Sequence, residues 1–277
     1  MTAAALVALA VVGVAVGFLA GLIGIGGGVF TVPFLYFFYS HSGWSGVSLA
    51  PALHATVAHA TSLFIIVPTA LVGTATYARA RLVVWRAALP VAAGAVAGAA
   101  LGALVAARVP GSALKVGFGL FLIASAVHLF TRRGARAAGP VRLTLPVVAV
   151  TGVVIGTFSA LLGVGGGLIG ITLLLHVVRL EMERVAATSL AIIAFAAAAG
   201  TVTYITTGHA QPGLPAGHLG YVHLAVALPM LPGAVLAVRW GARLNQQLDP
   251  NVLRWTFATL FVLLGTWIVL TNFGGLV

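Results

Sequence analysis

The sequence predicts an all-α integral membrane protein made of two inverted repeats, each a glycine-broken helical hairpin followed by three transmembrane helices. That arrangement gives about 8 to 10 helices in total. Three observations predict this class. The 277 residues are 61% hydrophobic and only 6% charged, whereas about a quarter of the residues in soluble domains are charged. Long apolar stretches recur along the whole chain, and several short sequence runs occur twice in the same order.

The apolar stretches define the expected elements in order. Each long stretch, at about 20 residues, can cross the hydrocarbon core of a bilayer as a helix. None has the alternating pattern of a membrane strand, so we do not expect a β-barrel. Two shorter stretches, 29–39 and 168–178, are roughly 16 Å long as helices and reach about half-way across the core. The long stretches are 3–23, 52–77, 85–107, 113–131, 143–162, 185–206, 219–240 and 252–271.

Two glycine-rich runs occupy equivalent places in the two halves of the chain. Residues 24–28 and 163–167 both read Gly-x-Gly-Gly-Gly and lie 139 residues apart, half of the chain length. Each glycine weakens a helix by about 1 kcal/mol, so we expect the helix to break there. Glycine also lets backbone N–H groups approach an anion, and helices broken at matching places are typical of transport sites. The alternative is that these glycines serve only close helix packing.

Further repeated runs indicate that the chain arose by tandem duplication. We expect a first membrane repeat over residues 1–136 and a second over 137–277. The linker between them, 131–142, carries four arginines. The runs 60–63, 73–77, 89–96 and 114–118 recur at 187–190, 200–204, 228–235 and 253–257.

The basic residues predict how the repeats face the membrane. If each glycine-broken segment returns to its own side, twelve of the fourteen basic residues share the side of the linker, and only Arg108 and Lys115 lie opposite. If each segment makes one full crossing, the fourteen divide seven and seven. Because cytoplasmic loops are rich in Lys and Arg, we expect inverted repeats with the linker in the cytoplasm and both termini outside. The arginines sit at helix ends, so we expect no nucleic-acid partner.

The sequence also argues against an enzyme. It contains no cysteine, so disulfides, thiol chemistry and Cys-based metal sites are excluded. We expect no metal, no cofactor and no catalytic residue, because no His-Glu-x-x-His pair occurs and no motif supports Ser159 with His176 as nucleophile and base. All three acidic residues fall in predicted loops, which leaves no carboxylate to relay protons in mid-membrane.

The candidate binding residues are those that could hold a small oxyanion. Backbone N–H groups of the glycine runs and repeated mid-helix hydroxyls would donate hydrogen bonds, unless the hydroxyls only bond the preceding turn. His59 could attract an anion or carry a proton, with His54 as second choice, unless both are neutral and bonded to backbone. The repeated Tyr77 and Tyr204 are expected to anchor helices at the membrane interface. The predicted site is Gly26, Gly27, Gly28, Gly165, Gly166, Gly167, Thr61, Ser62, Thr188, Ser189 and His59.

Together these motifs resemble the TauE/SafE sulfite-exporter family. The paired glycine runs, the Ala-Thr-Ser at 60–62 and 187–189, and the duplicated helical chain carry the resemblance over nearly the whole length. It implies secondary transport of a sulfur-containing anion, such as sulfite, a sulfonate or sulfoacetate, across the bacterial cytoplasmic membrane. The repeats differ where Thr172 stands for Pro33 and Ala186 for His59, so the substrate contacts are expected to be asymmetric.

Two other functions stay open from the sequence: a channel or facilitator for another small anion, and a membrane scaffold that transports nothing. The expected partners are the small sulfur-containing anion and the lipid bilayer, and the sequence leaves a homodimer open. By analogy with other duplicated transporters, we expect one half to rock against the other around a central site.

Overall fold

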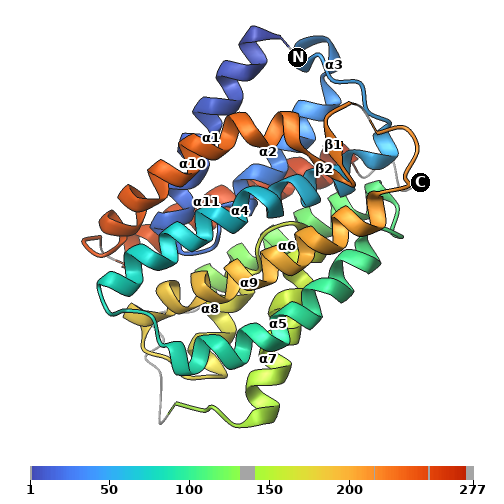
Figure 1. Cartoon of the computed structure of the whole chain (residues 1–277). Coiled ribbons are helices and arrows are strands. Elements are labelled where there is room, and N and C mark those ends of the chain that lie inside the picture. The colour runs from blue at the N-terminus through green and yellow to red at the C-terminus, as the bar shows by residue number, and fades with distance from the viewer. Residues whose placement is uncertain (1, 132–140, 215, 249, 273–277) are drawn as a thin grey trace.

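The computed structural model describes residues 2–131, 141–214, 216–248 and 250–272, and these are almost entirely helical (Figure 1). Within these ranges, eight helices are long and apolar enough to cross a membrane, which confirms the all-α membrane class. They are α1 (Ala3–Ile23), α4 (His54–Arg79), α5 (Trp85–Ala106), α6 (Gly111–Thr131), α7 (Leu145–Leu162), α9 (Met182–Gly208), α10 (Leu224–Asn245) and α11 (Pro250–Asn272).

The remaining elements are short. Helices α2 (Gly28–Ser40) and α8 (Gly167–His176) follow the two glycine runs, as the sequence predicts. A single turn, α3 (Ser42–Ser45), and a 3₁₀ turn, η1 (Pro51–Leu53), connect α2 to α4. Strands β1 (His218–Leu219) and β2 (Val222–His223) pair antiparallel just before α10. This hairpin takes up the beginning of the apolar stretch predicted over 219–240, so α10 begins five residues later than the sequence indicates.

Two helices form the core of the bundle. Helices α4 and α9 contact each other, and in each 72% of the apolar span is buried. In the other six spans only 28–44% is buried, so their apolar outer faces are suited to contact lipid. The most hidden helices are thus the two that carry the repeated Ala-Thr-Ser runs.

Each glycine-broken segment returns to the end of the bundle from which it starts. The hydroxyl of Thr2, before α1, donates to the carbonyl of Trp44 in α3 at 2.9 Å. In the second half, the N–H of Arg142, before α7, donates to the carbonyl of Val178, after α8, at 2.9 Å. Figure 1 shows that the two hairpins open at opposite ends of the bundle. We call these the α3 end and the α4–α5 end, after the segments found there.

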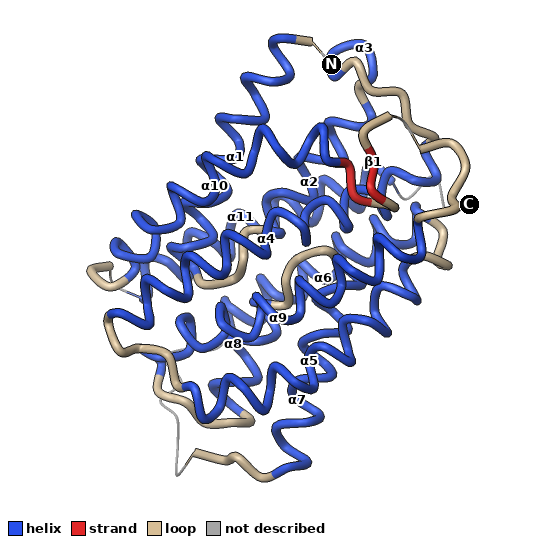
Figure 2. The backbone as a smooth tube through the Cα atoms, viewed as in Figure 1, coloured by secondary structure: helices blue, strands red, loops and turns tan. Residues whose placement is uncertain are grey.

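Backbone geometry explains the spacing of the glycines. Helix α1 ends at Gly24 (φ +75°) and α2 begins after Gly27 (φ +80°), with Gly26 between them at φ +86°. The three matching glycines of the second run also have positive φ, from +66° to +82°. Only glycine adopts this conformation freely, so the Gly-x-Gly-Gly pattern sets the two turns. Figure 2 shows them as non-helical segments inside the helical bundle.

The two predicted repeats interleave. Helix α1 of the first repeat packs along α10 of the second, and α5 of the first packs along α7 of the second. Glycines make both contacts close: a β-carbon at Gly17 would overlap Ala234 of α10, and one at Gly98 would overlap Val153 of α7. Small residues allow such approach between membrane helices. The predicted boundary at 136/137 lies outside the described residues.

The prediction of interfacial tyrosines is wrong. Tyr77 and Tyr204 are 1% and 0% exposed. Each donates a 2.9 Å hydrogen bond to a carbonyl of another helix, Tyr77 to Gly21 and Tyr204 to Ala160. Their position near helix ends suggested the membrane surface, but both rings point inward and tie the core helices α4 and α9 to the glycine-broken hairpins.

Replacing Tyr77 or Tyr204 with phenylalanine should therefore destabilise the protein. Each change removes the donor of a buried hydrogen bond and should lower the free energy of unfolding by about 1 kcal/mol. Thermal denaturation of the purified protein in detergent measures this loss. If both variants melted at the wild-type temperature, the hydroxyls would not hold the hairpins.

Candidate functional site

The two glycine turns contact each other in the middle of the bundle. A β-carbon at Gly28 would lie 2.6 Å from the Cα of Val164, and one at Gly167 would lie 2.6 Å from the Cβ of Ile25. Both turns also pack against Ile66 and Ile193, which lie near the midpoints of α4 and α9. The two short helices, predicted to reach about half-way across the core, thus begin at turns that contact each other.

Protein atoms fill the space around the glycines of the predicted site. A β-carbon at Gly27 would lie 2.9 Å from Val16, and one at Gly166 would lie 2.7 Å from the carbonyl of Ile155. A β-carbon built on Gly26 would lie 3.1 Å from the Cγ2 of Ile193, and one built on Gly165 would lie 3.0 Å from the same atom. Close packing, the alternative weighed above, therefore describes these residues in this conformation, and their role in anion binding stays a prediction.

The two predicted threonines hold loops of the opposite repeat. The hydroxyl of Thr61 accepts a hydrogen bond from the N–H of His223, just before α10, at 3.0 Å. The hydroxyl of Thr188 accepts one from the N–H of Val84, just before α5, at 3.1 Å. Both threonines thus receive the last N–H group before a helix of the other repeat, and this shared contact explains why the threonine recurs.

The two predicted serines differ from each other. Ser62 is fully buried and donates to the carbonyl of Gly163 at 2.8 Å, which ties α4 to the second glycine turn. Ser189 occupies the equivalent place on α9 and is 1% exposed. Its hydroxyl has no hydrogen-bond partner among the described residues. An unpaired buried hydroxyl is costly, so Ser189 has donor capacity that a ligand could use.

The two candidate histidines differ in their hydrogen-bond partners. The Nε2–H of His54 donates to the carbonyl of Leu49 at 2.9 Å, so this histidine has the backbone bond expected of a structural residue. His59 is fully buried, and its Nε2 is hydrogen-bonded to the hydroxyl of Tyr36. A β-carbon built on Gly163 would overlap the Cα of His59. This histidine therefore packs directly against the second glycine turn.

A third histidine, His223, lies directly before α10. His223 is 2% exposed, stacks on His218 with 4.0 Å between ring centroids, and has the hydroxyl of Tyr39 3.3 Å from its Nδ1. Burial, and secondarily the neighbouring His218, lower the pKa of His223 to about 3. Burial thus favours the neutral form of this ring.

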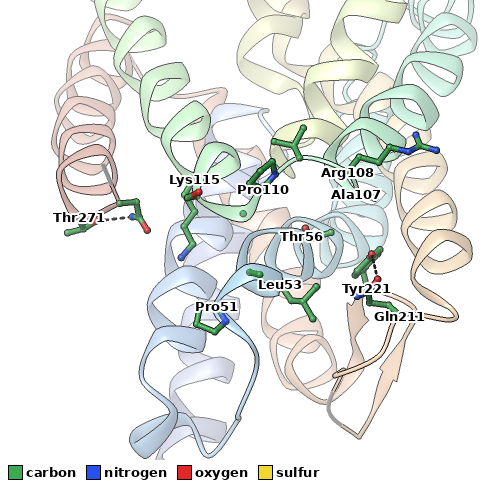
Figure 3. A pocket seen from close by; sticks show the side chains of 15 residues that line it. Pro51, Leu53, Thr56, Ala107, Arg108, Pro110, Lys115, Gln211, Tyr221 and Thr271 are labelled. Atoms are coloured by element: carbon green, nitrogen blue, oxygen red, sulfur yellow. Dashed lines mark hydrogen bonds between the residues drawn. The ribbon is translucent and has the colours of Figure 1, made fainter. Parts of the chain in front are cut away.

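Two residues that were not among the predicted site residues connect His59 to the α3 end. Tyr36 of α2 bonds its imidazole, and the ammonium of Lys115 lies 5.5 Å from the centre of the Tyr36 ring. Lys115 also lines a cavity of about 590 Å³ at the α3 end (Figure 3). It is the single lysine of the chain. Its place inside the apolar stretch 113–131 could have marked it as a candidate site residue, but it was counted only as a basic residue that sets the topology.

Comparison with known proteins gives consistent results. A model of the family described as "Sulfite exporter TauE/SafE" matches residues 9–268. The chain is 28% identical over 267 residues, 95% of its length, to probable membrane transporter protein MJ0441 of Methanocaldococcus jannaschii, of which 94% is covered. It is 26% identical to probable membrane transporter protein YunE of Bacillus subtilis, with 95% of this chain and 97% of the relative covered. No solved structure gives a significant match.

Proposed function

Since this chain belongs to the sulfite exporter TauE/SafE family, we propose that it is a secondary transporter that moves small sulfur-containing anions across the cytoplasmic membrane. The substrate class is sulfite, a sulfonate, sulfoacetate or a similar organosulfur anion. The family and the names of the relatives support a membrane transporter rather than an enzyme. The identity of the anion is our proposal.

The meeting of the two glycine turns is the observation that carries this proposal. Helices α2 and α8 both begin at these turns, so their N-termini lie together inside the bundle. The N-terminus of a helix carries partial positive charge, and paired broken helices in transporters point such ends at anionic groups. The unpartnered hydroxyl of Ser189 adds a donor close to α8. Among the described side chains, the carboxylates of Glu181 and Glu183 are exposed at the beginning of α9, away from this region.

The same contacts support inverted repeats. The α1–α2 hairpin opens at the α3 end and the α7–α8 hairpin opens at the other (Figure 1). Arg108 and Lys115 line the cavity at the α3 end, whereas the other described arginine side chains lie toward the α4–α5 end. By the positive-inside rule the α4–α5 end faces the cytoplasm, and both termini lie outside.

The interleaving of the repeats changes the expected motion. Rocking one sequence half against the other would separate α1 from α10 and α5 from α7, which pack through glycines. We propose instead that the moving bodies are spatial groups. One contains α1, α2, α4 and α10, and the other contains α5, α7, α8 and α9, with α4 and α9 at the boundary.

Uptake of labelled sulfite into proteoliposomes, with and without a pH gradient, tests the function. Sulfonates, thiosulfate, sulfate and acetate serve as competitors. Saturable uptake that sulfur oxyanions inhibit is the expected result, and acceleration by the gradient would reveal proton coupling. Uptake that rises linearly without saturation would indicate a channel, and uptake no higher than in empty liposomes for every anion would contradict transport of this class.

A further inference from the structure

We infer that the cavity at the α3 end is an anion-binding site in which Lys115 holds an oxyanion group on its way to the glycine turns. The choice of a sulfur oxyanion rests on the proposed function. The cavity, its positive charge and its connection to His59 support the site independently of that choice.

The cavity is large enough for a small anion with its water. Its volume of about 590 Å³ lies within the usual range for ligand pockets, about 300–1,000 Å³. The wall combines η1 and the first turn of α4 with the α5–α6 loop and the beginning of α6, and Gln211, Tyr221 and the end of α11 complete it. Figure 3 shows Lys115 extending from α6 toward the segment that carries Pro51 and Leu53.

Lys115 has no counter-ion among the described residues. Lys115 is only 9% exposed. The structure gives it no hydrogen bond or ion pair with any described residue, and its recorded contact is the face of the Tyr36 ring. None of the described residues that line the cavity is acidic. Cations within membrane-spanning segments are costly, and they pair or mark ion pathways. A bound anion would supply the missing charge.

Other groups of the cavity also favour an anion. Helix α6, 21 residues long, begins at the cavity with Gly111 and Ser112, whose N–H groups belong to its first turn. Such N–H groups and the helix dipole stabilise negative charge. Thr56, 5% exposed, presents a hydroxyl for which the described residues offer no hydrogen-bond partner. Arg108 is exposed and extends away from Lys115, so it adds positive charge at the rim (Figure 3).

A polar route leads inward from Lys115. The lysine lies over the Tyr36 ring, the Tyr36 hydroxyl bonds His59, and His59 packs against Gly163. In the second repeat Arg254 stands in place of Lys115, but Leu175 stands in place of Tyr36 and Ala186 in place of His59, so the contacts inward of the cation are not repeated. We therefore assign capture of the anion by Lys115 to the α3 side.

Direct binding tests the site without requiring transport. Sodium sulfite should raise the melting temperature of the detergent-purified protein in a saturable way, because a ligand stabilises the state that it binds. Lys115→Met, which keeps the length of the side chain and removes its charge, should abolish this rise, and Lys115→Arg should retain it. Arg243→Gln, which removes an exposed cation at the other end, is the matched control and should behave as wild type. An equal rise in Lys115→Met and wild type would overturn the inference.

Transport separates this inference from the proposed function. In vesicles of phosphatidylcholine, Lys115→Met should raise the KM for sulfite by about tenfold to a hundredfold, since it removes a charge-assisted hydrogen bond to the anion. An unchanged KM beside normal wild-type flux would overturn the site and leave the transporter standing. Absence of flux in all variants, with binding still dependent on Lys115, would overturn the substrate proposal and leave the site standing.

A lipid headgroup offers the same oxyanion chemistry as a free anion. Adding phosphatidylglycerol to the vesicles distinguishes the two sources. Sulfite binding that depends on Lys115 and is unaffected by phosphatidylglycerol supports a site for the free anion. Competition by the lipid that disappears in Lys115→Met would assign the site to headgroups and overturn its role in sulfite capture.

Discussion

Replacing Gly167 with alanine should destabilise the protein strongly, so that it is less abundant in the membrane and melts well below wild type. The added β-carbon would overlap the Cα of Ile25 and lie 2.7 Å from its carbonyl carbon. Those atoms belong to the backbone of the other glycine turn, which cannot move aside as a flexible side chain does. Overpacking of this kind typically costs about 1–3 kcal/mol, and a backbone clash belongs at the upper end. Gly28→Ala, whose β-carbon would meet Val164, should behave in the same way.

Gly117→Ala is the matched control. Gly117 lies within α6, and nothing lies within 4 Å of a β-carbon built on it. Alanine is favoured over glycine by about 1 kcal/mol in a helix interior, so this variant should be as stable as wild type or more so. Melting temperature in detergent and abundance in isolated membranes are the measurements. A Gly167→Ala protein that melts with the control would show that the two turns do not touch.

The packing also limits what other glycine variants reveal. Leucine at Gly27 or Gly166 would disturb Val16 or Ile155 as well as any ligand. Both positions have positive φ, which L-amino acids with a β-carbon seldom adopt. Loss of transport in such variants would therefore report on folding as much as on binding, and a test of the site needs a residue that is not required for packing.

The sequence predicted the fold well where one physical signal dominates. Spans follow from hydrophobic length, and the hairpins follow from glycines at positive φ, so the boundaries of α1, α5 and α7 fall within two residues of the predicted stretches. The beginning of α10 was missed because the β-hairpin before it carries no Asp, Glu, Lys or Arg and contains Leu219 and Val222, so it continues the apolar stretch. The pairing of α1 with α10 depends on glycine spacing on facing helices, which the pattern of one helix does not reveal.

The candidate site was predicted less completely. Residue type identified polar groups inside the bundle, and Thr61 and Thr188 are indeed equivalent, but their hydroxyls are engaged by backbone of the opposite repeat. Tyr36 and Lys115 were missed because they join His59 only through contacts between α2, α4 and α6. Such juxtapositions arise from packing between distant segments and cannot be read from spacing along the chain.

The serine pair offers the clearest test of the predicted site. Ser62→Ala removes a hydroxyl that donates to Gly163 at 2.8 Å and leaves that carbonyl unpaired. We expect a loss of about 1 kcal/mol in unfolding free energy. Ser189→Ala removes a hydroxyl without a partner in the described structure, so stability should be unchanged or higher. Melting temperatures of the two variants, measured side by side, give the structural half of the comparison.

Transport gives the functional half. If the Ser189 hydroxyl donates to the anion during its passage, Ser189→Ala should reduce sulfite uptake about tenfold while the protein remains fully folded, since a hydrogen bond to a charged group contributes roughly 1.5–3 kcal/mol. Ser189→Thr, which keeps the hydroxyl, should retain more uptake than Ser189→Ala. Normal flux in Ser189→Ala would show that the Ser189 hydroxyl of α9 does not bind the anion. Reduced flux at an unchanged melting temperature cannot come from packing, because the deleted hydroxyl stabilises nothing in the resting protein.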